Sequence, residues 1–226
     1  YRIESKLEDE RNCMNYFRKV LLIFLVVGGL GVFSSLILYS FREPFVTVYN
    51  ATRPLLLHGA GEKCIGELDA KNVTYTKLGD IGTKKCPRLN AVRVSGFKNI
   101  KLSSPFTLSC PTASKVASWL ADINASSIKH MGTLNCRKRR GRSIVSEHSF
   151  GTAIDISHID GASVKNDWGK NNENGKILKK AATSACRYFH NVLTPDSNRL
   201  HHDHFHLDTG LGLGCSFDNI KHIFKL

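Results

Sequence analysis

The stretch His201-His202-Asp203-His204-Phe205-His206-Leu207-Asp208 is the most informative part of the chain, because it holds four of the ten histidines within six residues. Side chains of an extended strand alternate between its two faces, and residues 203–208 are predicted to form such a strand. The polar residues that then share one face are His202, His204, His206 and Asp208. Phe205 and Leu207 point the other way, toward a core. Because neutral imidazole is the commonest protein ligand for zinc, the stretch indicates one half of a metal site.

The other half lies upstream, in the sequence SEHSFGTAIDI of residues 146–156. Residues 152–157 are predicted to form a strand whose two isoleucines share a buried face. Asp155 alternates with them and therefore points to the opposite, polar face. Gly151 permits a bend before this strand, and the bend lets His148 fold back beside Asp155.

We predict that His148, Asp155 and His206 bind Zn2+. A catalytic zinc is usually held by three protein ligands, here two histidine nitrogens and one carboxylate oxygen, and a water takes the fourth position. His204 is then expected beside the metal without binding it. Each half alone has an ordinary interpretation, because a lone strand aspartate usually faces solvent and a lone surface histidine usually has no chemical role. The two halves together favour the metal, since their faces are predicted independently from the apolar pattern.

The chain divides into four predicted parts. Residues 1–19 form a short tail, residues 20–41 an apolar segment, residues 42–62 a tether, and residues 63–226 the globular domain. The apolar segment has 22 uncharged residues, which span about 33 Å as a helix and so predict a single-pass signal anchor. Cleavage of this segment as a signal peptide is an alternative.

Flanking charge predicts the orientation of the anchor in the inner (cytoplasmic) membrane. Five basic side chains precede the segment, and only two follow within the next 20 residues. Cytoplasmic flanks carry the excess of lysine and arginine, so the tail is expected in the cytoplasm and the domain in the periplasm or another extracytoplasmic space.

The cysteine count agrees with an exported domain. One cysteine, Cys13, precedes the apolar segment, and six follow it. An even number in an oxidising compartment predicts three disulfides, for which 15 pairings are possible. A structural zinc site built from cysteines is disfavoured, because the chain contains no C-x-x-C pair.

A formal charge of +13 predicts an anionic partner, and the densest basic run is Arg137 to Arg142. For an exported domain the expected partner is peptidoglycan or another anionic envelope polymer. A solvated, mobile loop is the alternative. Nucleic acid is not expected, since no recognition helix or aromatic-interleaved pattern accompanies the charge.

Two helices and three strands are predicted in the domain. The helices cover Pro111 to Ile123 and Gly175 to Leu193, the second ending before Pro195, and the strands cover 128–135, 152–157 and 203–208. Strands and helices mix without regular alternation, which predicts an α+β domain with an antiparallel sheet and flanking helices.

The block SEHSFGTAIDI resembles the metal motif of D,D-carboxypeptidases of the vancomycin-resistance type, and HFHLD resembles the His-x-His end of the wider group of LAS zinc metallopeptidases. That group shares its fold with the hedgehog signalling domain. Over residues 64–209 the chain more closely resembles the bacterial extensin-like C-terminal domain family. This resemblance is carried by motifs such as CIGEL (64–68), NCR (135–137), SEH (146–148) and VLTPD (192–196).

The resemblance implies a hedgehog/D,D-peptidase-like zinc domain with His148, Asp155 and His206 as ligands and His204 near the zinc-bound water. Arg137 is implied as a second catalytic residue, which binds a substrate carboxylate. The chain differs from carboxypeptidases whose motif ends in E-x-x-H, because it has no glutamate at that position. This difference favours the endopeptidase branch of the group. The residues expected to support the ligand histidines are Asp208, Asp203 and His201.

The function that these expectations imply is hydrolysis of a peptide bond in peptidoglycan by a membrane-anchored zinc peptidase, either an endopeptidase or a D,D-carboxypeptidase. A second possibility is a non-catalytic envelope-binding module stabilised by zinc and disulfides. His204 distinguishes the two, because a hydrolase needs it and a binding module does not.

Overall fold

The computed structural model describes residues 61–141 and 143–211, together with Val48 and Thr52. The predicted tail (1–19), the predicted membrane segment (20–41) and most of the predicted tether (42–62) lie outside the described residues. Within the described ranges, no helix is long and apolar enough to cross a membrane.

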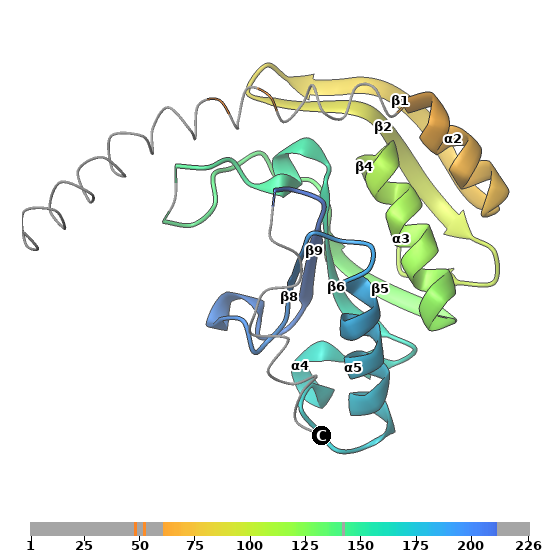
Figure 1. Ribbon diagram of the computed structural model, residues 1–226, viewed down its shortest axis with the longest axis vertical. Helices are drawn as coiled ribbons and strands as arrows, with labels where there is room; N and C mark the ends of the chain where they lie inside the picture. Colours follow the sequence, from red (N-terminus) through yellow and green to blue (C-terminus); the bar gives the residue numbers. More distant parts are fainter. Residues whose placement is uncertain (1–47, 49–51, 53–60, 142, 212–226) are drawn as a thin grey trace, which may run out of the picture. The chain divides into compact units, whose positions relative to one another are not determined.

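An antiparallel sheet of three strands opens the compact unit Asn50–Leu226 (Figure 1). Its strands, in spatial order, are β1 (Val73–Thr83), β2 (Cys86–Phe97) and β4 (Phe106–Ser109). The helices that pack against it are α2 (Gly61–Ala70) and α3 (Cys110–Ile123). Pro111 lies in the first turn of α3, where a missing N–H costs nothing.

A second, mixed sheet carries the candidate site. In spatial order its strands are β3 (Lys101–Leu102), β5 (Ser127–Gly132), β6 (Ala153–Ile159), β9 (Phe205–Asp208) and β8 (Asn191–Leu193), and β7 (Ala162–Ser163) pairs with β6. Only the β3–β5 pair among them is parallel. The predicted α+β class, with antiparallel strands and flanking helices, is confirmed.

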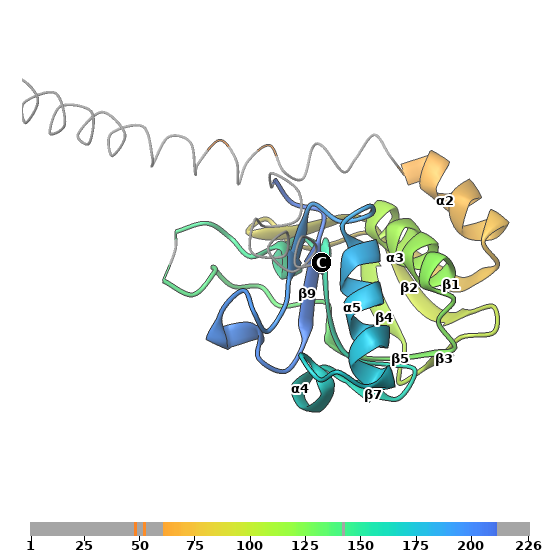
Figure 2. The ribbon, with the colours of Figure 1, turned by 60° about the horizontal axis from the view of Figure 1, so that its bottom comes forward.

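The core lies between this sheet and the helices α3 and α5 (Glu173–Ala185), with the one-turn helix α4 (Val164–Asp167) at its edge. Trp119 of α3 is fully buried, donates its indole N–H to the carbonyl of Ala181 at 3.0 Å, and meets Phe189 edge to face. In the sheet, Ile154, Ile156, Phe205 and Leu207 are also fully buried. Figure 2 shows α3 and α5 side by side, with the loop residues 133–141 and 143–146 and the helix η2 (Arg199–His201) projecting on the opposite side.

The end predicted for the second helix is wrong. The helix α5 ends at Ala185, and Asn191–Leu193 forms β8 instead of a last helical turn. The residues after Cys186 include arginine, two aromatics, histidine and asparagine, most of which are weak helix formers. Pairing of β8 with β9 gives this segment strand hydrogen bonds and still buries Val192.

The predicted strands exist with shifted ends. Strand β5 ends three residues before 135, β6 extends to Ile159, and β9 begins at Phe205 rather than 203. Alternation of side chains indicated which faces are buried, but it did not indicate where strand pairing ends.

Two disulfides join pairs of described cysteines, Cys64–Cys110 and Cys86–Cys136, with Cα–Cα distances of 5.9 and 5.8 Å. Cys186 is disulfide-bonded as well. The prediction of a disulfide-stabilised domain is therefore confirmed for these cysteines. The first bridge fastens α2 to the start of α3, and the second fastens the start of β2 to the loop after β5.

Candidate metal centre

Antiparallel pairing of β6 with β9 brings the two predicted halves of the site together. Asp155 and His206 lie directly opposite each other in the strand register, although 51 residues separate them in the sequence. His148 comes from the short helix η1 (Glu147–Phe150) just before β6. The turn between them uses Gly151, whose φ of +69° lies in the left-handed region that favours glycine.

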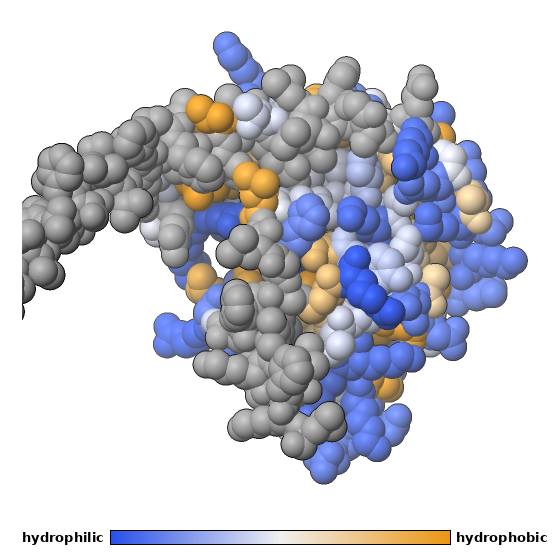
Figure 3. Space-filling model, in the orientation of Figure 1, coloured by the Kyte–Doolittle hydropathy of each residue, from blue (hydrophilic) through white to orange (hydrophobic). Residues whose placement is uncertain are grey.

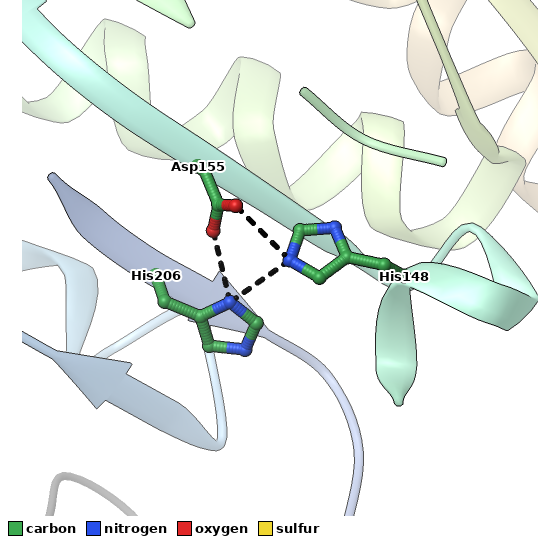
Figure 4. A group of neighbouring side chains, drawn as sticks. All are labelled: His148, Asp155 and His206. Atoms are coloured by element: carbon green, nitrogen blue, oxygen red, sulfur yellow. Dashed lines mark hydrogen bonds and ion pairs between the residues drawn. The ribbon is translucent and has the colours of Figure 1, made fainter. Parts of the chain in front are cut away.

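The donor atoms of His148, Asp155 and His206 converge on one point (Figure 4). His148 Nε2 lies 3.1 Å from His206 Nδ1 and 3.2 Å from Asp155 Oδ2. His206 Nδ1 lies 2.9 Å from Asp155 Oδ1. Two ligand atoms of a tetrahedral zinc are about 3.3 Å apart when each lies about 2.0–2.1 Å from the metal. Both the donor types and their spacing therefore fit a zinc ion.

The second nitrogen of each histidine is held by an oxygen behind the cluster. His148 Nδ1 lies 3.2 Å from the carbonyl oxygen of Thr133, and His206 Nε2 lies 2.9 Å from Asp208 Oδ2. These oxygens accept, so the nitrogens donate, and the neutral form of each ring presents a lone pair to the cluster. Hydrogen bonds of this kind orient metal-binding histidines and fix their tautomers.

The charges of the cluster favour a cation. Burial raises the pKa of Asp155, but hydrogen bonds with His148 and His206 outweigh it and hold that pKa well below its usual range. Burial lowers the pKa of His206, but hydrogen bonds to Asp155 and Asp208 outweigh it and raise the pKa to about 9. A metal ion at this point therefore competes with a proton on His206.

Asp208 is held rigidly behind His206. Its carboxylate is almost fully buried and accepts hydrogen bonds from Asn191 Nδ2 at 2.7 Å and from the Gly210 N–H at 2.8 Å. Burial raises the pKa of Asp208, but the hydrogen bonds from His206, Asn191 and the Gly210 N–H, together with the charge of His206, outweigh burial and lower that pKa. Asp208 thus occupies the place expected of a residue that supports a ligand histidine.

His204 lies at the rim of the cluster. Its Nε2 is 3.7 Å from Asp155 Oδ1, and its Nδ1 donates to Asp203 Oδ1 at 2.8 Å. That hydrogen bond lowers the pKa of Asp203 and fixes the ring with Nε2 toward the cluster. His204 is therefore near the three converging side chains without being one of them.

His201 also contacts the cluster. Its ring centroid lies 5.2 Å from that of His204 and 5.6 Å from that of His206, and its Nδ1 lies 2.8 Å from Asn198 Oδ1. Burial, together with the neighbouring His206 and His204, lowers the pKa of His201 to about 4. The ring is therefore neutral at pH 7 and presents Nε2 as a hydrogen-bond acceptor.

The prediction that His202 shares the ligand face is wrong. Its side chain is exposed, and its Nδ1 lies 3.1 Å from the Arg199 carbonyl oxygen. The alternation predicted from 203 onward does not extend back to it, because η2 and a turn precede β9, which begins only at Phe205. The turn places His201 rather than His202 against the cluster.

Arg137 is fastened beside η1 through its backbone. Its N–H donates to Ser149 Oγ at 3.0 Å, and that hydroxyl donates to the Arg137 carbonyl oxygen, also at 3.0 Å. The guanidinium is exposed and donates to the carbonyl oxygen of Lys138 at 3.4 Å. It is not one of the groups that converge on the cluster.

Glu147, next to the predicted ligand His148, has a buried carboxylate whose burial the sequence did not predict. Arg139 Nη2 lies 3.6 Å from its Oε1, and the Thr152 hydroxyl donates to both its carboxylate and its backbone carbonyl. A Cβ at Gly210 would lie only 2.3 Å from Oε1, so the absence of a side chain there makes room for this carboxylate. No local pattern marks Glu147, since its partners come from three separate segments.

The chain was compared with protein families, curated proteins and solved structures, and one family matches most of the described domain. No curated protein and no solved structure matches the chain. A family model described as extensin-like protein C-terminus matches residues 62–215, a range that holds every residue of the cluster. The expected resemblance to the extensin-like C-terminal domain family is thereby confirmed, and the chain belongs to the extensin-like protein C-terminus family.

Proposed function

We propose that this protein is a zinc-dependent hydrolase that cleaves a peptide bond in peptidoglycan, as an endopeptidase or a D,D-carboxypeptidase. The observation that carries the proposal is the convergence of His148 Nε2, His206 Nδ1 and the Asp155 carboxylate within 3.2 Å of one another. A relation to the LAS metallopeptidases and to the hedgehog/D,D-peptidase fold is part of the same proposal. It is supported by the order of the motifs, with His-x6-Asp upstream and His-x-His downstream.

The cluster would hold the metal with three side chains and leave room for a fourth ligand. When bound, zinc supplies Lewis acidity and an open coordination position, which is the usual layout of a catalytic rather than a structural zinc. The buried carboxylate of Asp208 would keep the His206 ring oriented, and the carbonyl oxygen of Thr133 would do so for His148.

The proton transfers fall to His204. Its Nδ1–H bond to Asp203 leaves Nε2 free to accept a proton from the attacking water and to donate it to the leaving amine. The neutral His201 would accept a hydrogen bond from a group entering on the same side. Arg137 would bind a carboxylate of the cross-link peptide, because its exposed guanidinium is anchored close to η1.

The proposed setting is a single membrane anchor with the domain in the periplasm or another extracytoplasmic space. The two disulfides between described cysteines support this setting, since disulfides persist in oxidising compartments. The uncharged segment 20–41 supports the anchor.

The test is incubation of the full chain, purified in mild detergent and loaded with zinc, with monomeric and cross-linked muropeptides, followed by mass spectrometry. The expected result is a mass change of one water that disappears with a chelator and in His204→Ala. No change on any muropeptide, with zinc still bound, would refute the hydrolase and favour the non-catalytic binding module.

A further inference from the structure

Two basic segments that lie far apart in the sequence meet at one end of the β1–β2 hairpin. Lys84 and Lys85 form the turn between the strands, and Arg88 follows on β2. The second segment is the run Arg137-Lys138-Arg139-Arg140 in the loop after β5. The disulfide Cys86–Cys136 joins them, and each of its cysteines is adjacent to a basic residue. We call these seven residues the basic surface.

Backbone pairing joins the two sides of the loop that carries the second segment. Lys138 and Val145 form an antiparallel bridge, and the Arg139 N–H donates to the Ile144 carbonyl oxygen at 2.9 Å. At its base, Val145 packs with Phe150 of η1 and with Leu89 of β2. A covalent bond and an apolar cluster thus both hold the loop against the β1–β2 hairpin.

Few carboxylates neutralise this surface. In residues 84–88 and 136–141 there is no aspartate or glutamate. Glu147 faces Arg139 but is buried, and Asp80 is engaged by the N–H of Asn90 at 2.8 Å. The Nε of Arg88 is buried and has no hydrogen-bond partner among the described residues. The other basic residues except Arg139 are exposed, so their positive charge is available to an external anion: Lys84, Lys85, Arg137, Lys138 and Arg140.

The basic surface adjoins the candidate metal centre. Ser149 bonds the backbone of Arg137 on both its N–H and its carbonyl, and Ser149 directly follows the ligand His148. A long polyanion bound to the basic surface would thus lie close to the cluster of His148, Asp155 and His206.

The composition of the surface discriminates among polyanions. Neither segment contains an aromatic residue on which a nucleic-acid base could stack. The large hydrophobic side chains that are exposed in the described ranges all lie outside the two segments, so nothing in them inserts into a bilayer. On the face shown in Figure 3, hydrophilic side chains dominate and hydrophobic ones form small separate groups. Arginine forks suit carboxylates well.

We propose that the basic surface binds the carboxylate-bearing peptide–glycan polymer of the cell wall and holds it beside the candidate metal centre. This inference rests on the proposed function for the identity of the polymer. The binding itself requires no hydrolysis, so the two can fail separately.

The test is co-sedimentation of the full chain, in mild detergent, with purified sacculi from which phosphate-bearing wall polymers have been removed. The surface variant is Lys84→Glu with Lys85→Glu. The matched control is Lys165→Glu with Lys179→Glu, two exposed lysines on α4 and α5. We expect the surface variant to weaken binding at least about fivefold, the control less than about twofold, and added salt to weaken wild-type binding.

Sacculi whose carboxylates have been amidated should lose most of the wild-type binding. Equal effects of the two double variants, or unchanged binding to amidated sacculi, would overturn the proposal. So would a charge-dependent affinity for anionic vesicles or single-stranded DNA that exceeds the affinity for sacculi. Absence of muropeptide cleavage by the wild-type chain, with sacculus binding intact, would refute only the hydrolase.

Discussion

Metal binding by the cluster depends on which nitrogen of each histidine ring faces it. His148 offers Nε2 and His206 offers Nδ1, and in each case the other ring nitrogen is bonded to an oxygen behind the cluster. We expect one zinc per wild-type chain and less than about a tenth of that in His148→Ala or Asp155→Asn, because losing one of three ligands weakens binding steeply. Metal content after gel filtration measures it.

The control for this loss of zinc is His202→Ala, which removes an exposed histidine from the same histidine-rich stretch of residues 201–208. It should keep a full complement of zinc. Equal loss in the control and in the ligand variants would mean that the converging side chains do not bind the metal.

His204 and Asp203 are expected to act in turnover rather than in metal binding. His204→Ala should lower kcat by about 10²–10⁴-fold, because a positioned acid–base group is removed. Asp203→Asn should lower it by about 10–100-fold through loss of ring orientation. Steady-state kinetics on the muropeptide that is cleaved, with zinc content measured in parallel, tests both. Loss of zinc in His204→Ala would contradict the assignment.

Zinc binding should release protons and strengthen with pH. Asp155 and Asp208 raise the pKa of His206 to about 9, so at pH 7 the proton must leave before Nδ1 can bind a metal. The apparent affinity should rise as pH increases toward 9 and level off above it. Calorimetry in two buffers of different ionisation enthalpy counts the protons. A pH-independent affinity between 6 and 9 would contradict it.

The stability of the zinc-free protein should have the opposite pH dependence, falling as the pH rises. The raised pKa of His206 makes its protonated form a stabilising one, so this contribution is complete below the unfolded pKa of about 6.5. It is lost as the pH rises through about 9. Zinc-free protein should therefore unfold at lower urea concentration at pH 9 than at pH 6, as far as this group is concerned.

At the scale of elements, the turn between η1 and β6 positions His148 relative to Asp155. Gly151→Ala should destabilise the fold by about 1–3 kcal/mol, because a side chain is strained at φ +69° and its Cβ would lie 3.1 Å from the Ser109 nitrogen. Zinc affinity should fall with it. Urea unfolding measures the change.

Gly66→Ala is the matched control for that substitution. Gly66 lies in α2 with open space where a Cβ would stand, and alanine is the better helix former. Stability should stay equal or rise by up to about 1 kcal/mol. A Gly151→Ala protein as stable as this control would show that the turn tolerates a side chain.

Local patterns predicted the elements that carry the site better than they predicted where those elements end. The alternation in residues 152–157 correctly separated the buried Ile154 and Ile156 from Asp155. Helical spacing extended the last helix through Val192, because a residue buried in β8 and one buried on a helix look alike in sequence. Only the pairing with β9 distinguishes them, and pairing is a long-range property.

The same limit applied to the site. The convergence of His148, Asp155 and His206 could be predicted, since strand alternation gave the faces of Asp155 and His206 and the bend at Gly151 gave the position of His148. The contact of His201 and the burial of Glu147 were not, because a turn and three separate segments produce them. Contacts that depend on irregular backbone leave no periodic trace in a sequence.

At the scale of the whole molecule, the pairing of the cysteines tests the proposed orientation of the chain in the membrane. Cys186 is disulfide-bonded, and the other four described cysteines pair with one another. We expect its partner to be Cys215, because Cys13 precedes the predicted membrane segment. Peptide mapping under non-reducing conditions tests the pairing. A peptide that links Cys186 to Cys13 would contradict both the pairing and the proposed orientation.

The register of β6 against β9 has a consequence for zinc retention. Asp155 and His206 face each other only in this register, and a slip of one residue would send every side chain of one strand to the opposite face. Under the proposed function, stable zinc binding therefore requires correct long-range pairing of β6 with β9. A zinc ion retained through purification would then report that a given copy of the chain has these two strands in the right register.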